Sequence, residues 1–238
     1  MSKFLFFDTE TTGNTPDDFL CQIAYKNGDE IFCELYKPSV PIPPEASAVH
    51  HITNKMIADK PAFRESGDYS KLKELFENPE IISVAHNAKF DLNMLKKEDI
   101  EPKNVICTLR LARYLDKENK IPRYNLQFLR YYLDMDIDAQ AHDALGDVKV
   151  LEALFVRLKN KVVAECGGDE EKALEEMLAI SARPSLMNII PFGKYVGKTV
   201  EWIVGYDCNY LEWLLAEKTK NPVDEEDWIY TLKHYLKK

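Results

Sequence analysis

Apolar and polar positions follow two different patterns along the first part of the chain, and together they predict an α/β fold. Short apolar runs typical of buried strands occupy residues 3–7, 20–25, 30–36, 81–85 and 104–107. Asn27-Gly28-Asp29 separates the second run from the third and predicts a hairpin. Apolar residues at helical spacing occupy residues 69–76, 91–97, 108–115, 125–133 and 144–158. A strand meander followed by alternating strands and helices indicates a mixed β-sheet flanked by helices.

Two stretches interrupt this pattern and divide the chain. Residues 37–67 hold most of the prolines of the first half, which predicts an irregular loop with one short helix near residues 54–58. After Cys166-Gly167-Gly168, residues 169–180 predict a second, acidic helix that Asp169 caps. We expect three parts: a domain over residues 1–160, a helical linker over residues 161–188 and a small C-terminal module over residues 189–238.

The C-terminal module contains all three tryptophans of the chain, Trp202, Trp213 and Trp228. A module of about fifty residues needs large aromatic side chains simply to form a core. We therefore expect these tryptophans to be packed inside it.

Composition adds limits on compartment and partners. Hydrophobic residues make up 45% of the 238 residues and charged residues 30%, which is typical of globular proteins, and no apolar stretch is long enough to cross a membrane. The chain reaches Asp8 too early for a secretory signal peptide, and its five cysteines are odd in number and widely spaced. These features predict a cytoplasmic protein with reduced thiols. The formal net charge of -9 argues at first against a polyanionic partner.

The strongest chemical feature is a pair of acidic residues at the end of the first predicted strand. Asp8 and Glu10 are two positions apart, so a strand places both carboxylates on one face. Two carboxylates this close repel each other unless a proton or a cation neutralises them, and a hard divalent cation with oxygen ligands is the usual solution. For this pair alone, a polar strand end entering a turn is an equal alternative.

Two further segments place acidic residues at the ends of predicted elements. Asp91 follows His86 and Asn87 after the fourth predicted strand, and Asp147 follows His142 near the start of the amphipathic helix. An acidic residue at a helix start has a simpler explanation, which is its favourable interaction with the helix dipole. All three segments together, in this order, indicate one site.

These motifs resemble those of the DEDDh branch of 3′→5′ exonucleases, which have a ribonuclease H-like fold. The matching positions are Asp8, Glu10, Thr12 and Gly13, then His86, Asn87, Phe90 and Asp91, then His142, Ala144 and Asp147. Residues 48–53 form a further similar stretch, with His51 where many members carry glycine. Residues 191–198, with Tyr210 and Trp213, look like the small module of exonuclease X-like proteins within this branch.

The resemblance implies roles for these residues in phosphodiester hydrolysis by a two-metal mechanism. It implies that two divalent cations, Mg²⁺ or Mn²⁺, are held by Asp8, Glu10, Asp91 and Asp147. His142 is then the general base, and Thr11, Thr12 and Gly13 lie against the 3′-terminal nucleotide. For these three residues the alternative is a simple turn with Gly13 at positive φ. For His86 and Asn87, positioning of the substrate and local hydrogen bonding are equal alternatives.

A basic segment precedes the third motif. Residues 103–130 contain seven lysines and arginines against two acidic residues, a local charge of +5, with tyrosines interleaved. Possible contacts to a DNA backbone are Arg110, Arg113, Lys117, Lys120 and Arg123, and a solvated helix face is an equal alternative. Because four acidic residues are candidate metal ligands and this segment is basic, the net charge does not exclude a nucleic acid partner.

The sequence therefore predicts a metal-dependent 3′→5′ exodeoxyribonuclease that releases nucleoside 5′-monophosphates. Its expected partner is DNA with a free 3′ end, its expected role is DNA repair, and no membrane association is expected. Three alternatives remain: an RNA-trimming 3′→5′ exoribonuclease, a polymerase proofreading subunit and a non-catalytic nucleic-acid-binding adaptor. The presence of all four acidic residues and of His142 argues against the adaptor.

Overall fold

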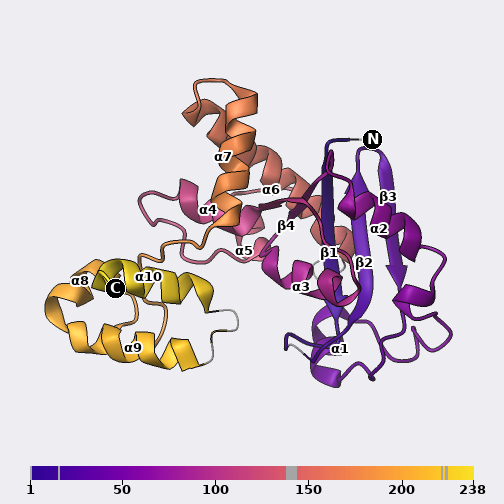
Figure 1. Cartoon of the computed structure of the whole chain (residues 1–238), viewed down its shortest axis with the longest axis horizontal. Coiled ribbons are helices and arrows are strands. Elements are labelled where there is room, and N and C mark those ends of the chain that lie inside the picture. Colours follow the sequence, from indigo (N-terminus) through magenta and orange to yellow (C-terminus); the bar gives the residue numbers. More distant parts are fainter. Residues whose placement is uncertain (1, 16, 138–143, 221, 223–224) are drawn as a thin grey trace.

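A mixed five-stranded sheet forms the centre of the computed structural model, which describes residues 2–15, 17–137, 144–220, 222 and 225–238 (Figure 1). Its strand order is β3-β2-β1-β4-β5. The strands are β1 (Phe4–Thr11), β2 (Leu20–Asn27), β3 (Glu30–Leu35), β4 (Ile82–Ala85) and β5 (Asn104–Cys107). The pairs β1–β2 and β2–β3 are antiparallel, whereas β1–β4 and β4–β5 are parallel. The predicted mixed sheet is confirmed.

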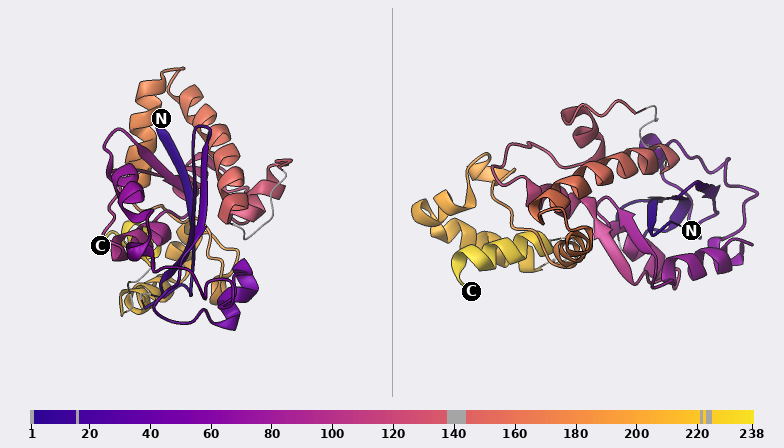
Figure 2. Two further views of the ribbon diagram at one scale, coloured as in Figure 1. Left: turned by 90° about the vertical axis from the view of Figure 1, so that its right-hand side faces the viewer. Right: turned by 90° about the horizontal axis from the view of Figure 1, so that it is seen from above.

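Helices cover both faces of this sheet (Figure 2). One face carries α2 (Tyr69–Glu77) and α3 (Lys89–Lys97), and the other carries α4 (Thr108–Leu115), α5 (Leu126–Tyr132), α6 (Ala144–Glu165) and α7 (Glu170–Ala182). The alternation of side chains along β1 decides what meets each face. Leu5 and Phe7 belong to the buried cluster of α2 and α3. Phe6 packs against Phe155 of α6, with ring centroids 5.4 Å apart.

Two elements differ from the sequence prediction. The short helix of the proline-rich loop is α1 (Pro44–His50), with Pro44 at its start, where the missing N–H of proline has no cost. Residues 54–58 instead form turns, so the helix predicted there is wrong. Strand β1 extends to Thr11, well past the predicted end at residue 7, because its pairing with β2 continues to Thr11. A single-turn 3₁₀ helix, η1 (Phe63–Glu65), precedes α2.

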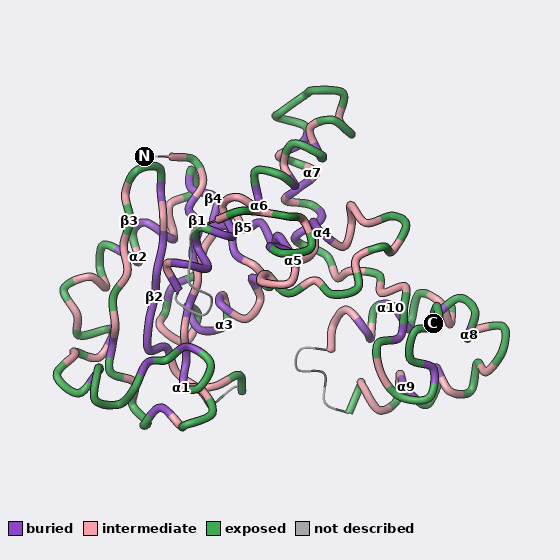
Figure 3. The backbone as a smooth tube through the Cα atoms, turned by 180° about the vertical axis from the view of Figure 1, so that it is seen from behind, coloured by how far each residue is buried: buried purple, intermediate pink, exposed green. Residues whose placement is uncertain are grey.

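The C-terminal residues form a small helical unit with its own core (Figure 3). It comprises η2 (Gly193–Tyr195), α8 (Val200–Tyr206), α9 (Cys208–Lys220) and α10 (Glu226–Leu236). Trp228 belongs to its buried cluster and is 9% exposed, as expected for packing. Trp202 and Trp213 are 44% and 56% exposed, so the packing predicted for them is wrong. The core is filled instead by aliphatic residues such as Ile203 and Leu211.

Residues 161–188, the predicted linker, contain the end of α6 and the whole of α7. Asp169 caps α7 as predicted, accepting hydrogen bonds from two backbone N–H groups of its first turn. Ala173, Met177 and Ile180 of α7 lie in the same buried cluster as α6. The division of the chain at residues 160 and 188 remains a prediction. Among the described helices, none has the combination of length and apolar character that spanning a lipid bilayer requires.

Candidate active site

Three carboxylates meet at the end of β1. Asp8 and Glu10 share the face of β1 that α6 covers, and Asp147 lies in the first turn of α6. One carboxylate oxygen from each lies within 4.8 Å of the others, and this is the only such group of three or more potential ligands among the described residues. A set of carboxylate oxygens alone is the donor set that hard divalent cations prefer. The residues present therefore fit a site for such a cation.

Asp91, the fourth predicted ligand, approaches the same strand from its other face. It lies in the first turn of α3, and its Oδ1 accepts hydrogen bonds from the backbone N–H of Thr9, at 3.1 Å, and from the Thr9 hydroxyl, at 2.7 Å. Thr9 stands between Asp8 and Glu10 in the strand, so Asp91 is held across the backbone from both. Asp91 is 3% exposed, and burial raises its pKa to about 7 despite the bonds from Thr9.

This raised pKa predicts opposite effects of Asp91→Asn on stability and on activity. A raised pKa contributes stability below the ordinary pKa of Asp, and this contribution is lost as pH rises through about 7. Asparagine can still accept both bonds from Thr9 but carries no charge. We expect the Tm of the metal-free variant to rise relative to that of the metal-free wild type from pH 5 to pH 8. The degradation activity of the variant is expected to be lower than that of the wild type. Differential scanning calorimetry with exposed Asp59→Asn as control tests this; a constant difference would contradict it.

The turn after β1 is closed by Asp18, a residue that no motif indicated. Its Oδ1 accepts a bond from the Thr12 hydroxyl at 2.8 Å, and its Oδ2 accepts one from the Thr15 N–H at 2.8 Å. Burial opposes the charge of Asp18, but these hydrogen bonds outweigh it and lower the pKa. A Cβ on Gly13 would lie 2.6 Å from Asp18 Oδ2, and Gly13 is not among the residues with positive φ. This close approach to Asp18 therefore explains why residue 13 is glycine. The three-residue spacing from Thr15 to Asp18, typical of a turn closed by side-chain hydrogen bonds, is the sequence signal that could have identified Asp18.

His50 supports the same turn by a hydrogen bond to the Thr11 carbonyl. Its Nδ1 accepts a bond from the Ile52 N–H at 3.0 Å, so its Nε2 carries the proton and donates to the Thr11 carbonyl at 3.1 Å. Burial lowers the pKa of His50, which keeps the ring neutral. His50 thus positions the backbone that follows Glu10.

His86 and Asn87 are placed differently from each other. The Nε2 of His86 lies 2.6 Å from the Tyr124 carbonyl, to which it donates, and Nδ1 accepts from the Thr108 hydroxyl at 2.9 Å. Burial lowers the pKa of His86 to about 4. These internal partners favour the local hydrogen-bonding role. Asn87 is exposed and has φ of 60°, a conformation that asparagine tolerates.

The third motif is described in part. His142 lies outside the described residues, whereas Asp147 is mostly buried and accepts a hydrogen bond at Oδ1 from the Gln127 side chain on α5. Arg130 Nη1 in turn donates to Gln127 Oε1 at 3.4 Å. No sequence pattern marked Gln127, because a single glutamine on an amphipathic helix has no distinctive context.

The predicted backbone contacts of the basic segment have several different environments. Arg110 and Arg113 form ion pairs with Glu226 and Asp227 of α10. The ammonium of Lys117 lies 3.3 Å from the centroid of the Tyr114 ring. Lys120 forms an ion pair with Glu118, and Arg123 is exposed. Their contact with DNA remains a prediction.

Comparison with known proteins assigns the class. The exonuclease family (RNase_T) matches residues 5–155, more than half of the chain, so this chain belongs to that family and is a DEDDh-type 3′→5′ exonuclease with a ribonuclease H-like fold. The chain is similar to exodeoxyribonuclease 10 of Escherichia coli (strain K12), at 33% identity over 210 residues, covering 85% of this chain and 83% of that protein. It is 32% identical to DNA polymerase III subunit epsilon of Treponema pallidum (strain Nichols) over 169 residues, covering 65% of this chain and 75% of that protein.

A solved structure supports the same class. Exonuclease X in complex with 5′ overhanging duplex DNA has a TM-score of 0.57 and 28% identity, covering 75% of this chain and 99% of that chain. Members of this family depend on a divalent metal ion, in agreement with the carboxylate cluster of Asp8, Glu10 and Asp147.

Proposed function

We propose that this protein is an exodeoxyribonuclease of DNA repair that removes nucleoside 5′-monophosphates one at a time from a 3′ end. The observation that carries the proposal is the cluster of Asp8, Glu10 and Asp147 within 4.8 Å, with Asp91 directly across β1. The choice of DNA is supported by the names of the relatives, an exodeoxyribonuclease and an exonuclease solved with duplex DNA.

In the proposed mechanism the four acidic residues would hold two divalent cations, Mg²⁺ or Mn²⁺. Asp8, Glu10 and Asp147 would hold one, and Asp8 with the Oδ2 of Asp91, the oxygen to which Thr9 donates no bond, would support the second. When bound, the cations activate water and offset negative charge on the scissile phosphate. The Gln127 amide holds Asp147 in one orientation.

The remaining steps belong to the protein's own groups. His142 takes the proton of the attacking water at a ring nitrogen, and a histidine with a pKa near 6.5 suits this task at neutral pH. The Thr11–Gly13 turn orients the 3′-terminal nucleotide, with the Thr12 N–H itself bonded to the Phe19 carbonyl. Asp18 bonds to the Thr12 hydroxyl and His50 to the Thr11 carbonyl, so the turn keeps its conformation when the nucleotide binds.

A degradation assay with defined ends tests this function. Purified protein with Mg²⁺ is incubated with 5′-labelled single-stranded DNA, duplex DNA and RNA, each with a free or a blocked 3′ end. We expect a ladder that shortens from free 3′ ends of DNA and no product from blocked ends. Internal cuts on a blocked strand would contradict the exonuclease assignment. Faster decay of RNA would favour the exoribonuclease, and binding without turnover would favour the adaptor.

A further inference from the structure

A cavity of about 660 Å³ lies where the C-terminal helices meet the sheet domain. It is bounded by the start of α3, β5, α4, the end of α7 and the start of α10. Its charged lining residues are Lys89, Lys103, Arg110, Arg113, Glu226 and Asp227. Four cations against two acids give a net charge of +2. Both the size and the charge suit a phosphate-bearing group as large as a nucleotide.

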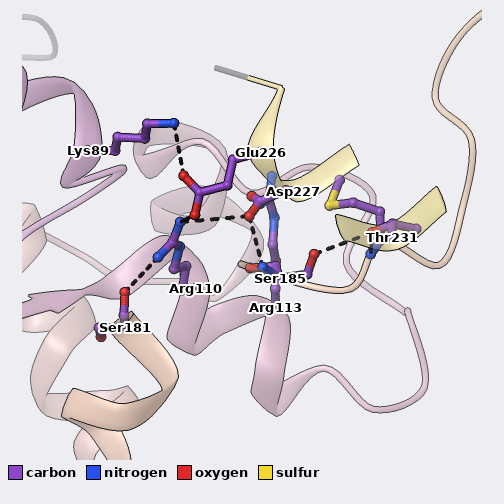
Figure 4. A network of polar contacts seen from close by, with 9 residues as sticks. Lys89, Arg110, Arg113, Ser181, Ser185, Glu226, Asp227 and Thr231 are labelled. Carbon is purple, nitrogen blue, oxygen red and sulfur yellow. Dashed lines mark hydrogen bonds and ion pairs between the residues drawn. The ribbon is translucent and has the colours of Figure 1, made fainter. Parts of the chain in front are cut away.

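The two acids of the cavity come from α10 and bind its cations directly (Figure 4). Glu226 lies 3.0 Å from Arg110 Nη2 and 2.9 Å from Lys89 Nζ, and Asp227 lies 2.5 Å from Arg113 Nη1. The Arg110 and Arg113 side chains are only 15% and 19% exposed. Guanidinium groups bind carboxylates and phosphates with the same geometry, so the two acids occupy positions that phosphate oxygens could take.

Part of the cationic lining is not engaged by these acids. Lys103 is exposed on the lining of the cavity and forms no ion pair with any described residue. The cavity therefore retains one exposed ammonium, that of Lys103, for a further anion.

The cavity also lies close to the catalytic carboxylates. Two of its lining residues, Lys89 at the first position of α3 and Asn87 just before that helix, precede Asp91 by two and four residues. The β5 residues Val105 and Cys107, which also line the cavity, belong to the cluster of α2 and α3, the face from which Asp91 reaches β1. A substrate strand that passes Asp91 would thus have phosphates beside this cavity.

We propose that this cavity binds the phosphodiester backbone of the substrate strand beside the active site, and that Glu226 and Asp227 occupy its arginines until the strand displaces them. This inference rests on the proposed function, because it takes nucleic acid as the substrate. It assigns the C-terminal module a part in substrate binding: α10 competes with the strand for Arg110 and Arg113.

Binding measurements on charge variants test this proposal. All variants carry Asp8→Asn to prevent degradation, and the Kd for fluorescein-labelled single-stranded DNA is followed by anisotropy over a range of salt concentrations. We expect Glu226→Gln with Asp227→Asn to tighten binding by about tenfold, because two competing anions are removed. Lys103→Gln is expected to weaken binding and to reduce the slope of log K against log salt by about 0.7. Lys172→Gln, an exposed lysine on α7, is the control and is expected to change neither.

The outcomes separate the two claims. If the double variant melts at a lower temperature but binds DNA as tightly as its parent, and Lys103→Gln behaves like Lys172→Gln, the ion pairs only attach the module and the inference is wrong. If the double variant does not fold, the salt slope of Lys103→Gln decides alone. If no variant binds DNA, the proposed function fails together with this inference.

Discussion

Replacing Asp8 with asparagine is expected to lower kcat by about 10³-fold or more while leaving the fold intact. Asp8 is the acidic residue that both proposed cation sites share, and a bound cation supplies several kcal/mol of transition-state stabilisation. At about 1.4 kcal/mol for each tenfold change in rate, the loss of about 4 kcal/mol corresponds to 10³-fold. Single-turnover degradation of 5′-labelled DNA measures this effect.

The control for Asp8→Asn is Asp17→Asn, which removes an exposed carboxylate in the turn just after β1. We expect this control to keep the wild-type rate. The Tm of the metal-free Asp8→Asn protein should not fall, since the variant removes one of three crowded carboxylates. A large fall in the Tm of Asp8→Asn would indicate that its loss of activity comes from unfolding. Full activity of Asp8→Asn would refute the assignment of the site.

Replacing His142 with alanine is expected to lower kcat by about 10²–10⁴-fold, the usual contribution of a general base. With saturating metal ion, wild-type kcat/KM should rise with pH on the acid side of its optimum, because a general base must be deprotonated to act. His142→Ala should lose this rising limb, because no imidazole remains to be deprotonated. Initial rates from pH 5 to pH 9 show both effects.

His234→Ala serves as the matched control for His142→Ala. His234 is exposed near the end of α10 and does not line the cavity beside Asp91, so its removal should change neither the rate nor the pH profile. A His142→Ala protein that keeps the rising limb with an unchanged midpoint would show that another group accepts the proton.

The elements near the site were predictable where local physics decides them. Strand β5 has the predicted bounds, and Asn125 and Asp169 begin α5 and α7 with side chains that accept backbone hydrogen bonds. The end of β1 was not predictable from its apolar run. Polar residues continue that strand because β2 pairs with them, and this pairing depends on the turn that returns the chain from Thr12 to Phe19, not on the polar residues themselves.

The candidate site divides in the same way. The spacing of Asp8 and Glu10 predicted one shared face, which β1 provides. The place of Asp91 depends on which face of the sheet α3 covers, and that depends on the chain's path from β4. Trp202 is exposed because the small core of the C-terminal unit is filled by other side chains. The number of aromatic residues in the sequence does not show which of them the core will contain.

The most direct test of the central claim is the identity of the released product. Single-stranded DNA with a free 3′ end is digested in H₂¹⁸O with Mg²⁺, and the products are analysed by mass spectrometry. Hydrolysis from the 3′ end predicts nucleoside 5′-monophosphates, each carrying one ¹⁸O on its phosphate after a single cleavage, and their absence with Asp8→Asn. Nucleoside 3′-monophosphates, oligonucleotides as the first products, or the same products from Asp8→Asn would contradict it.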